Sequence, residues 1–260
     1  MKYDIVLAGV GGQGILTIAY LLDNLAVRKG LRIKQSEVHG MAQRGGAVYS
    51  HMRISDDVII SDLIPDGAAD MILSVEPLEV QRYLHLLGPR GVVVSSNQPF
   101  INITDYPPEE QVLEALLRLS NALLINAKKI AAASKSPRSQ NVAMVGAATP
   151  FLPFEAADFV PIIEELFASK GEAVVNSNIQ VLENASSIGS FYKELLDGGV
   201  ANDLAYTLVE RIQVGSFAPE LADDYAKALA AKPTECKKAI SSLDEDVPQE
   251  RALLDMLKSA

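Results

Sequence analysis

The chain has 260 residues, of which 48% are hydrophobic and 22% are charged, and its formal net charge is −10. An acidic chain lacks the basic face that nucleic acids require, so we expect no nucleic-acid partner. The single cysteine, Cys236, cannot form an internal disulfide, ligate an iron–sulfur cluster or build a thiolate zinc site. No apolar stretch is long enough to span a bilayer and the N-terminus has no signal-peptide layout, so we expect no membrane partner and a cytoplasmic location.

Strand and helix patterns alternate through the first half of the chain. This alternation predicts an α/β fold with three layers, α/β/α, around a mixed, mostly parallel sheet. The turn at Asp56-Asp57 predicts an antiparallel hairpin between 47–54 and 58–60. Strands are predicted at 3–8, 31–38, 47–54, 58–60, 71–75, 91–96 and 122–125, and helices at 12–29, 77–87, 107–119 and 127–133.

The pattern becomes helical after residue 140. Residues 141–148 are small and apolar, which predicts a buried helix, and 155–169 and 179–196 repeat apolar residues near helical spacing. Beyond the glycine pair at 198–199 the chain contains interrupted helical patterns, which we interpret as a helical appendage.

A glycine-rich turn joins the first predicted strand to the first predicted helix. Its residues are Gly9, Val10, Gly11, Gly12, Gln13 and Gly14, and the first, third and last of them satisfy Gly-x-Gly-x-x-Gly. Such a turn lets an anion approach the backbone and the helix N-terminus behind it. With Glu37 as the acid that contacts a ribose, this pattern favours a nicotinamide or flavin enzyme. The equally weighted alternative is a tight turn whose glycines serve packing alone.

A second loop, between the next two predicted strands, contains Gln43, Arg44, Gly45 and Gly46. Loops that follow strands of a doubly wound sheet gather at one edge, so we expect this loop to face the glycine-rich turn. Arg44 would then bring a forked cation to a phosphate or carboxylate, unless it is an ordinary surface arginine. Glu76 ends a strand at the same edge, where we favour a helix cap over a ligand contact. We predict no catalytic residue and no metal site.

The ordered set of segments resembles a known family. These segments are Gly9–Gly14, Glu37–Gly46, Ser50–Ile54, Ser74–Glu79 and Asn141–Gly146. Together they resemble the gamma subunit, or gamma domain, of the 2-oxoacid:ferredoxin oxidoreductases, and they are most similar to the small (beta) subunits of the indolepyruvate ferredoxin oxidoreductases. The resemblance covers roughly residues 1–190, which implies a gamma-type domain at 1–190 and a helical C-terminal extension of unknown role at 191–260.

The resemblance implies a subunit of an enzyme that decarboxylates a 2-oxoacid oxidatively, passing the acyl group to coenzyme A and the electrons to ferredoxin. Thiamine diphosphate and iron–sulfur clusters would lie on a large catalytic partner subunit, and this chain alone would be inactive. The expected ligand shifts from a dinucleotide to coenzyme A. Alternatives are a pyruvate or 2-oxoisovalerate enzyme, a stand-alone NAD or FAD enzyme, and a pure assembly module. The expected binding residues are Gly9, Gly11, Gly12, Gln13, Gly14, Gln43, Arg44, Gly45 and Gly46.

Overall fold

The computed structural model describes residues 1–39, 45–101 and 103–197, followed by 201–203, 205–206 and 209–210. Its strands are β1 (Lys2–Val10), β2 (Arg32–His39), β3 (Ala47–Ser55), β4 (Ala69–Ser74), β5 (Leu87–Ser96) and β6 (Ala122–Ile125). Its α-helices are α1 (Ile15–Arg28), α2 (Pro77–Tyr83), α3 (Glu109–Leu117), α4 (Ala127–Ala133), α5 (Gln140–Ala148), α6 (Ala156–Phe167) and α7 (Glu172–Asp197).

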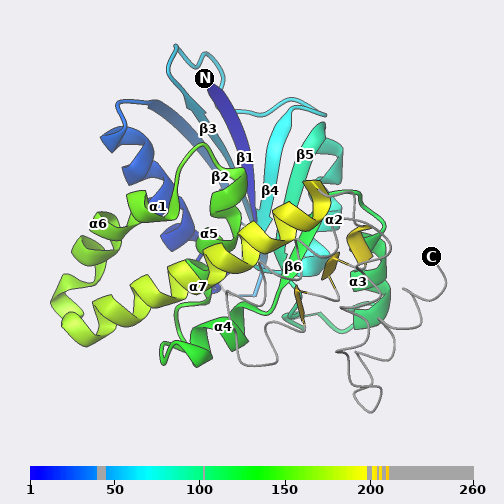
Figure 1. The fold of residues 1–260 in the computed structure, drawn as a ribbon. Helices are drawn as coiled ribbons and strands as arrows, with labels where there is room; N and C mark the ends of the chain where they lie inside the picture. The colour runs from blue at the N-terminus through cyan, green and yellow to red at the C-terminus, as the bar shows by residue number, and fades with distance from the viewer. Residues whose placement is uncertain (40–44, 102, 198–200, 204, 207–208, 211–260) are drawn as a thin grey trace.

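The strands form one sheet in the order β2-β3-β1-β4-β5-β6. β1, β4, β5 and β6 run parallel, whereas β3 is antiparallel to both of its neighbours, β1 and β2. The mixed, mostly parallel sheet is therefore confirmed, and helices on both of its faces make the predicted α/β/α architecture (Figure 1).

The predicted hairpin was wrong in its second strand. Residues 58–60 form no strand. β3 already has β1 on one side, through pairs such as Ile5↔Met52, and β2 on the other, through pairs such as Ile33↔Ile54. Both hydrogen-bonding edges of β3 are thus used, and no position beside it remains for 58–60.

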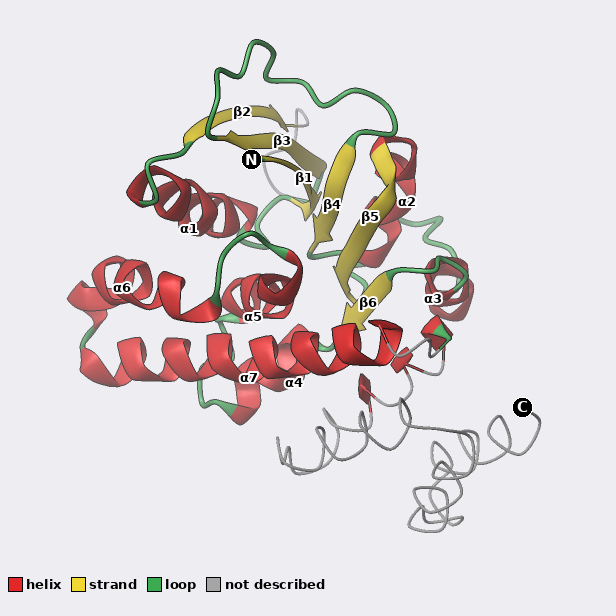
Figure 2. Cartoon of the chain, turned by 45° about the horizontal axis from the view of Figure 1, so that its top comes forward, coloured by secondary structure: helices red, strands yellow, loops and turns green. Residues whose placement is uncertain are grey.

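Two hydrophobic clusters hold the layers together. Successive side chains of a strand point to opposite faces, so in β1 Ile5 and Leu7 join one cluster and Val6 joins the other. The larger cluster lies against α1, α4, α5, α6 and α7, and the smaller one lies against α2 and α3 (Figure 2). Because the central strands are covered on both faces, their sequences read as nearly continuous apolar runs.

Glycines bring α5 and α7 into direct backbone contact. A Cβ on Gly146 would lie 2.4 Å from the carbonyl oxygen of Leu182, and a Cβ on Gly189 would lie 2.3 Å from that of Ala147. Each helix thus presents a glycine to a carbonyl of the other. This explains why α5 is rich in small residues: it lies buried between the sheet and α7.

Two predicted boundaries were displaced. α1 begins at Ile15, since the residues before it form the glycine-rich turn. The break expected after α2 at Gly88-Pro89 lies inside β5, which begins at Leu87. The pairing of β5 with β4 changes register in this stretch, and such an irregularity tolerates a proline that has no N–H to donate.

The last described residues belong to the core. α7 runs through residue 190 to Asp197, and its Tyr192 and Leu195 are completely buried. Ala205 and Val209 are also completely buried in the larger cluster. The boundary at 190 stays a prediction, and most of the expected extension at 191–260 lies outside the described residues. None of the helices in the described part of the chain combines the length and apolarity needed to cross a membrane.

Candidate functional site

The glycine-rich turn connects the end of β1 to the first turn of α1. Gly12 (φ 100°) and Gly14 (φ 83°) have left-handed backbone conformations that disfavour other residues. Gly9 has a different role, because a Cβ there would lie 2.3 Å from Cγ2 of Val75. No atom of the described residues lies within 4 Å of the position that a Cβ on Gly12 would take. Gly9 thus serves packing, whereas the part of the chain that the structure describes leaves Gly12 uncovered.

The Gln13 side chain fastens this turn to the adjacent parallel strand. Its Oε1 accepts a hydrogen bond from the Val10 amide (2.8 Å), and its Nε2 donates to the Val75 carbonyl (3.4 Å). Val75 directly follows β4, the neighbour of β1. Both polar ends of Gln13 therefore contact backbone, which gives the residue a structural function in addition to its predicted binding function.

The second loop meets the turn as expected. The Gly11 amide donates to the Gly46 carbonyl (2.9 Å), and the Gly45 amide donates to the Gly11 carbonyl (3.2 Å). These bonds extend the antiparallel β1–β3 ladder beyond its last pair, Val10↔Ala47. The structure thus brings Gly11, Gly45 and Gly46 together, whereas the predicted contacts of Gln43 and Arg44 lie outside the described residues.

Two helix N-termini converge on this edge of the sheet. Gly14 is the N-cap of α1, and the position that a Cβ on it would take lies 3.0 Å from Nδ2 of Asn141, in the first turn of α5. Neither helix has a side-chain hydrogen bond at its N-cap or an acidic residue in its first turn. By contrast, α2, α3, α6 and α7 each have an acid there, and α4, which has none, is capped by the side chain of Asn126.

An acid in the first turn neutralises the positive end of the helix dipole. Its absence from both α1 and α5 leaves two positive ends side by side, which is an arrangement suited to an anion. α5 was not among the predicted elements of the site. The available signal was the absence of acid at its start, but its distance from the glycine-rich turn in the sequence concealed the connection.

Glu76 at the end of β4 caps α2, as favoured from the sequence. Its side chain is 1% exposed, and its Oε2 accepts a hydrogen bond from the Glu79 amide (2.9 Å). The Tyr106 hydroxyl donates to Oε1 of Glu76 (2.5 Å). Burial, as the larger cause, and this hydrogen bond, as the second, raise the pKa of Tyr106 well above its usual range. Glu76 is thus occupied by protein groups.

Glu37, the expected ribose contact, lies exposed on β2, where its Oε1 accepts a hydrogen bond from Gln35 Nε2 (2.6 Å). Burial, with a smaller contribution from the charge of Glu37, raises the pKa of Asp23 on α1 to about 6. In the described residues, no three His, Cys, Asp or Glu side chains are grouped so that they could hold a metal ion.

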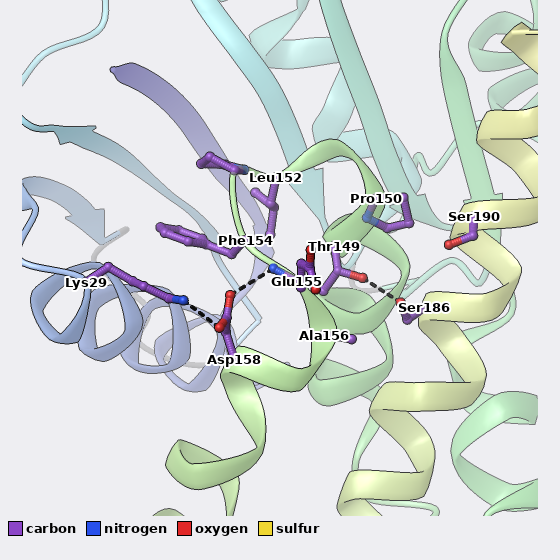
Figure 3. A pocket seen from close by; sticks show the side chains of 11 residues that line it. Lys29, Thr149, Pro150, Leu152, Phe154, Glu155, Ala156, Asp158, Ser186 and Ser190 are labelled. Carbon is purple, nitrogen blue, oxygen red and sulfur yellow. Dashed lines mark hydrogen bonds and ion pairs between the residues drawn. The ribbon is translucent and has the colours of Figure 1, made fainter.

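A groove of about 760 Å³ lies elsewhere, at the opposite edge of the sheet (Figure 3). It follows the C-terminus of α5, near the start of β1, where the Tyr3 hydroxyl donates to the Phe151 carbonyl. Two pairs of its polar groups contact each other: Lys29 Nζ lies 2.5 Å from Asp158 Oδ1, and the hydroxyls of Thr149 and Ser186 are 2.7 Å apart. None of the predicted site residues that the structure describes lines this groove.

Comparisons with known proteins agree with the fold. A family model described as pyruvate ferredoxin/flavodoxin oxidoreductase matches residues 4–188. The indolepyruvate oxidoreductase subunit IorB of Pyrococcus horikoshii is 37% identical to the chain over 172 residues, which cover 62% of this chain and 85% of the relative.

Two solved structures share the architecture. Pyruvate oxidoreductase subunit PORC of Thermotoga maritima matches with a TM-score of 0.55 at 19% identity, over 71% of this chain and 95% of that one. The 2-oxoglutarate:ferredoxin oxidoreductase of Magnetococcus marinus, solved with 2-oxoglutarate, coenzyme A and succinyl-CoA bound, matches with a TM-score of 0.58 at 18% identity. That match covers 73% of this chain and only 31% of the larger one.

Proposed function

Because the chain belongs to the pyruvate ferredoxin/flavodoxin oxidoreductase family, we propose that it is the small subunit of an indolepyruvate-type 2-oxoacid:ferredoxin oxidoreductase. The holoenzyme would decarboxylate the oxoacid, transfer the acyl group to coenzyme A and reduce ferredoxin. Thiamine diphosphate and iron–sulfur clusters would supply the carbanion and electron-transfer chemistry from the large subunit. The residues of this chain fit that division, since its single cysteine cannot ligate a cluster.

Within that enzyme, the chain's own contribution would be to bind the anionic part of coenzyme A. The observation that carries this proposal is the convergence of α1 and α5, two helix N-termini without a first-turn acid, beside the joined loops at Gly11 and Gly46. Amides in the first turns would donate hydrogen bonds to phosphate oxygens, except that of Val142, which donates to Asn141 Oδ1 (3.0 Å). Gly12 would let the phosphates approach the backbone, because no atom of the described residues lies within 4 Å of its Cβ position.

These residues would hold and orient the substrate without taking part in bond making. Fixing the phosphates on this chain converts the approach of the coenzyme A thiol into a step within one complex, which lowers the entropic cost of the transfer. Arg44, on the adjoining loop, would add a cationic side chain to the contacts made by the helix N-termini. The expected kinetic signature is an effect on KM for coenzyme A with little effect on KM for the oxoacid.

A substitution at Leu16 tests the anion site. Leu16 is exposed in the first turn of α1, so Leu16→Glu places a carboxylate at the helix N-terminus without creating a cavity. The dipole stabilises this acid in the free protein, but the acid repels a phosphate. We expect the holoenzyme to show a KM for coenzyme A raised about fivefold, an effect of roughly 1 kcal/mol, and reduced at high salt.

The neutral variant Leu16→Gln is the matched control for shape and polarity. Equal KM values for the two variants would show that the helix N-termini do not bind coenzyme A. Arg44→Ala should also raise this KM. The subunit assignment is tested separately: the large subunit purified without this chain should lack full indolepyruvate-dependent ferredoxin reduction, and full activity without this chain would disprove the assignment.

A further inference from the structure

The connection between β3 and β4 exposes three large apolar side chains. Val58 is 62% exposed, Ile60 is 91% exposed and Leu63 is 55% exposed. We call residues 56–66 the β3–β4 loop. Figure 2 shows it projecting beyond the strands, at the edge of the sheet where β4 begins and away from the glycine-rich turn. Large apolar side chains gathered on one exposed segment indicate a contact surface.

Hydrogen bonds to its backbone hold this loop in place. Arg53 on β3 donates from Nη1 to the carbonyls of Ser61 (3.1 Å) and Leu63 (3.0 Å), and Lys34 Nζ donates to the Ile60 carbonyl (2.9 Å). The rest of the Arg53 guanidinium is fixed by the fully buried carboxylate of Asp4, at 2.9 and 3.0 Å. The apolar side chains are therefore presented on a preorganised backbone, which lowers the entropic cost of binding.

Three exposed carboxylates lie close to the apolar residues in the sequence of this loop, and Lys34 is the cation that contacts the backbone at Ile60. Asp57, Asp62 and Asp66 lie on the same loop, and all three are exposed. The whole chain carries a net charge of −10. A second copy of this chain would bring acid against acid, which opposes association. Charge complementarity instead favours a different protein with an apolar socket and a basic rim.

We propose that the β3–β4 loop docks onto the large catalytic subunit, with Ile60 as its central apolar anchor and the three aspartates facing basic residues of that subunit. This inference rests on the proposed function, which supplies the partner. The loop lies at the edge of the sheet opposite the glycine-rich turn, so it can hold the subunits together without obstructing the coenzyme A site.

The test measures binding of the full-length chain to the purified large subunit. We expect Ile60→Ser to weaken the complex at least about tenfold, because a buried anchor at the centre of an interface contributes most of the affinity. Val27→Ser is the matched control, since Val27 is an apolar residue of α1 that is 61% exposed. Thermal melting of the isolated Ile60→Ser chain should match the wild type, because the side chain contacts solvent.

The outcomes separate the two proposals. If the wild-type chain does not bind the large subunit, the proposed function fails. If the wild type binds and Ile60→Ser binds equally well, or no worse than Val27→Ser, the docking loop is refuted while the proposed function stands. Asp62→Asn should slow association and weaken its salt dependence. A concentration-dependent dimer of the isolated chain that Ile60→Ser abolishes would assign the loop to self-association and overturn the proposal.

Discussion

Gly189→Ala is expected to destabilise the protein, although the same change usually stabilises a helix. Alanine is favoured over glycine in a helix interior by about 1 kcal/mol. Here, however, the new Cβ would lie 2.3 Å from the Ala147 carbonyl oxygen, 3.0 Å from its carbonyl carbon and 3.2 Å from its Cα. All three atoms are backbone, so no side chain can rotate away. α7 must move away from α5 by about 1 Å to restore normal contact distances.

Such a displacement separates the side chains that α7 packs against α5 and the sheet. Overpacking of this kind costs about 3 kcal/mol at the upper end of the usual range. After the helix-propensity gain, the net loss of unfolding free energy is about 2 kcal/mol, or a decrease in Tm of about 4–8 °C for a domain of this size. Urea and thermal denaturation followed by circular dichroism measure both quantities.

Asn176→Ala is the matched control, because Asn176 is exposed on the same helix. It changes helix propensity without changing packing, so it should raise the unfolding free energy by about 0.5 kcal/mol. If Gly189→Ala stabilises the protein as much as Asn176→Ala does, the close approach of α5 and α7 is not the reason for the glycine.

Three further predictions test other parts of the structure. Asp23 has a pKa of about 6, so between about pH 4 and 6 it binds a proton in the folded state that it has lost in the unfolded state, and the free energy of unfolding falls as pH rises through this range. Asp23→Asn should remove this loss. At pH 7 it should raise the free energy of unfolding by about 1 kcal/mol after solvent screening, seen as a higher urea midpoint, whereas below pH 4 it should have no such effect. Arg53→Lys should lower the free energy of unfolding by about 1–3 kcal/mol, because a lysine cannot bond Asp4 and two loop carbonyls at the same time. The same change should accelerate limited proteolysis within the β3–β4 loop, and an unchanged rate of cleavage would contradict this reasoning. Truncation after residue 190 removes the fully buried Tyr192 and Leu195, whose burial stabilises the fold by about 1.5–3 kcal/mol each. The 1–190 fragment should therefore lack the cooperative unfolding that a 1–210 chain keeps. Equal melting curves of the two chains would support a boundary at 190.

The parts of the fold that depend on local sequence were predictable. The apolar run before Gly9 and the helix after Gly14 are each indicated by the sequence within a few residues, and both elements were predicted, although the helix begins at Ile15 instead of residue 12. The pairing of β3 was not predictable in the same way, because it depends on which strands arrive beside it from elsewhere in the chain. Residues 58–60 have the composition of a strand, yet β1 and β2 occupy both positions next to β3.

The candidate site, too, was predictable in part, and the rest of it depends on contacts between residues far apart in the chain. The two loops could be brought together from the sequence, since the parallel directions of β1 and β2 put the ends of both at one edge. The packing function of Gly9 and the hydrogen bond from Gln13 Nε2 depend on Val75, and the second helix N-terminus depends on Asn141. No local pattern identifies contacts between residues so far apart in the chain.

The central position of β1 has a consequence during synthesis. β1 leaves the ribosome before the other strands of this sheet, but its neighbours are β3 and β4, so Ile5 must wait for Met52 on one side and Met71 on the other. At ordinary elongation rates this delay lasts roughly several seconds. Both edges of this apolar strand stay unpaired until β3 emerges, and the edge that receives β4 stays unpaired for the whole interval, a state that invites aggregation. The nascent chain should therefore depend on chaperones most strongly before β4 emerges.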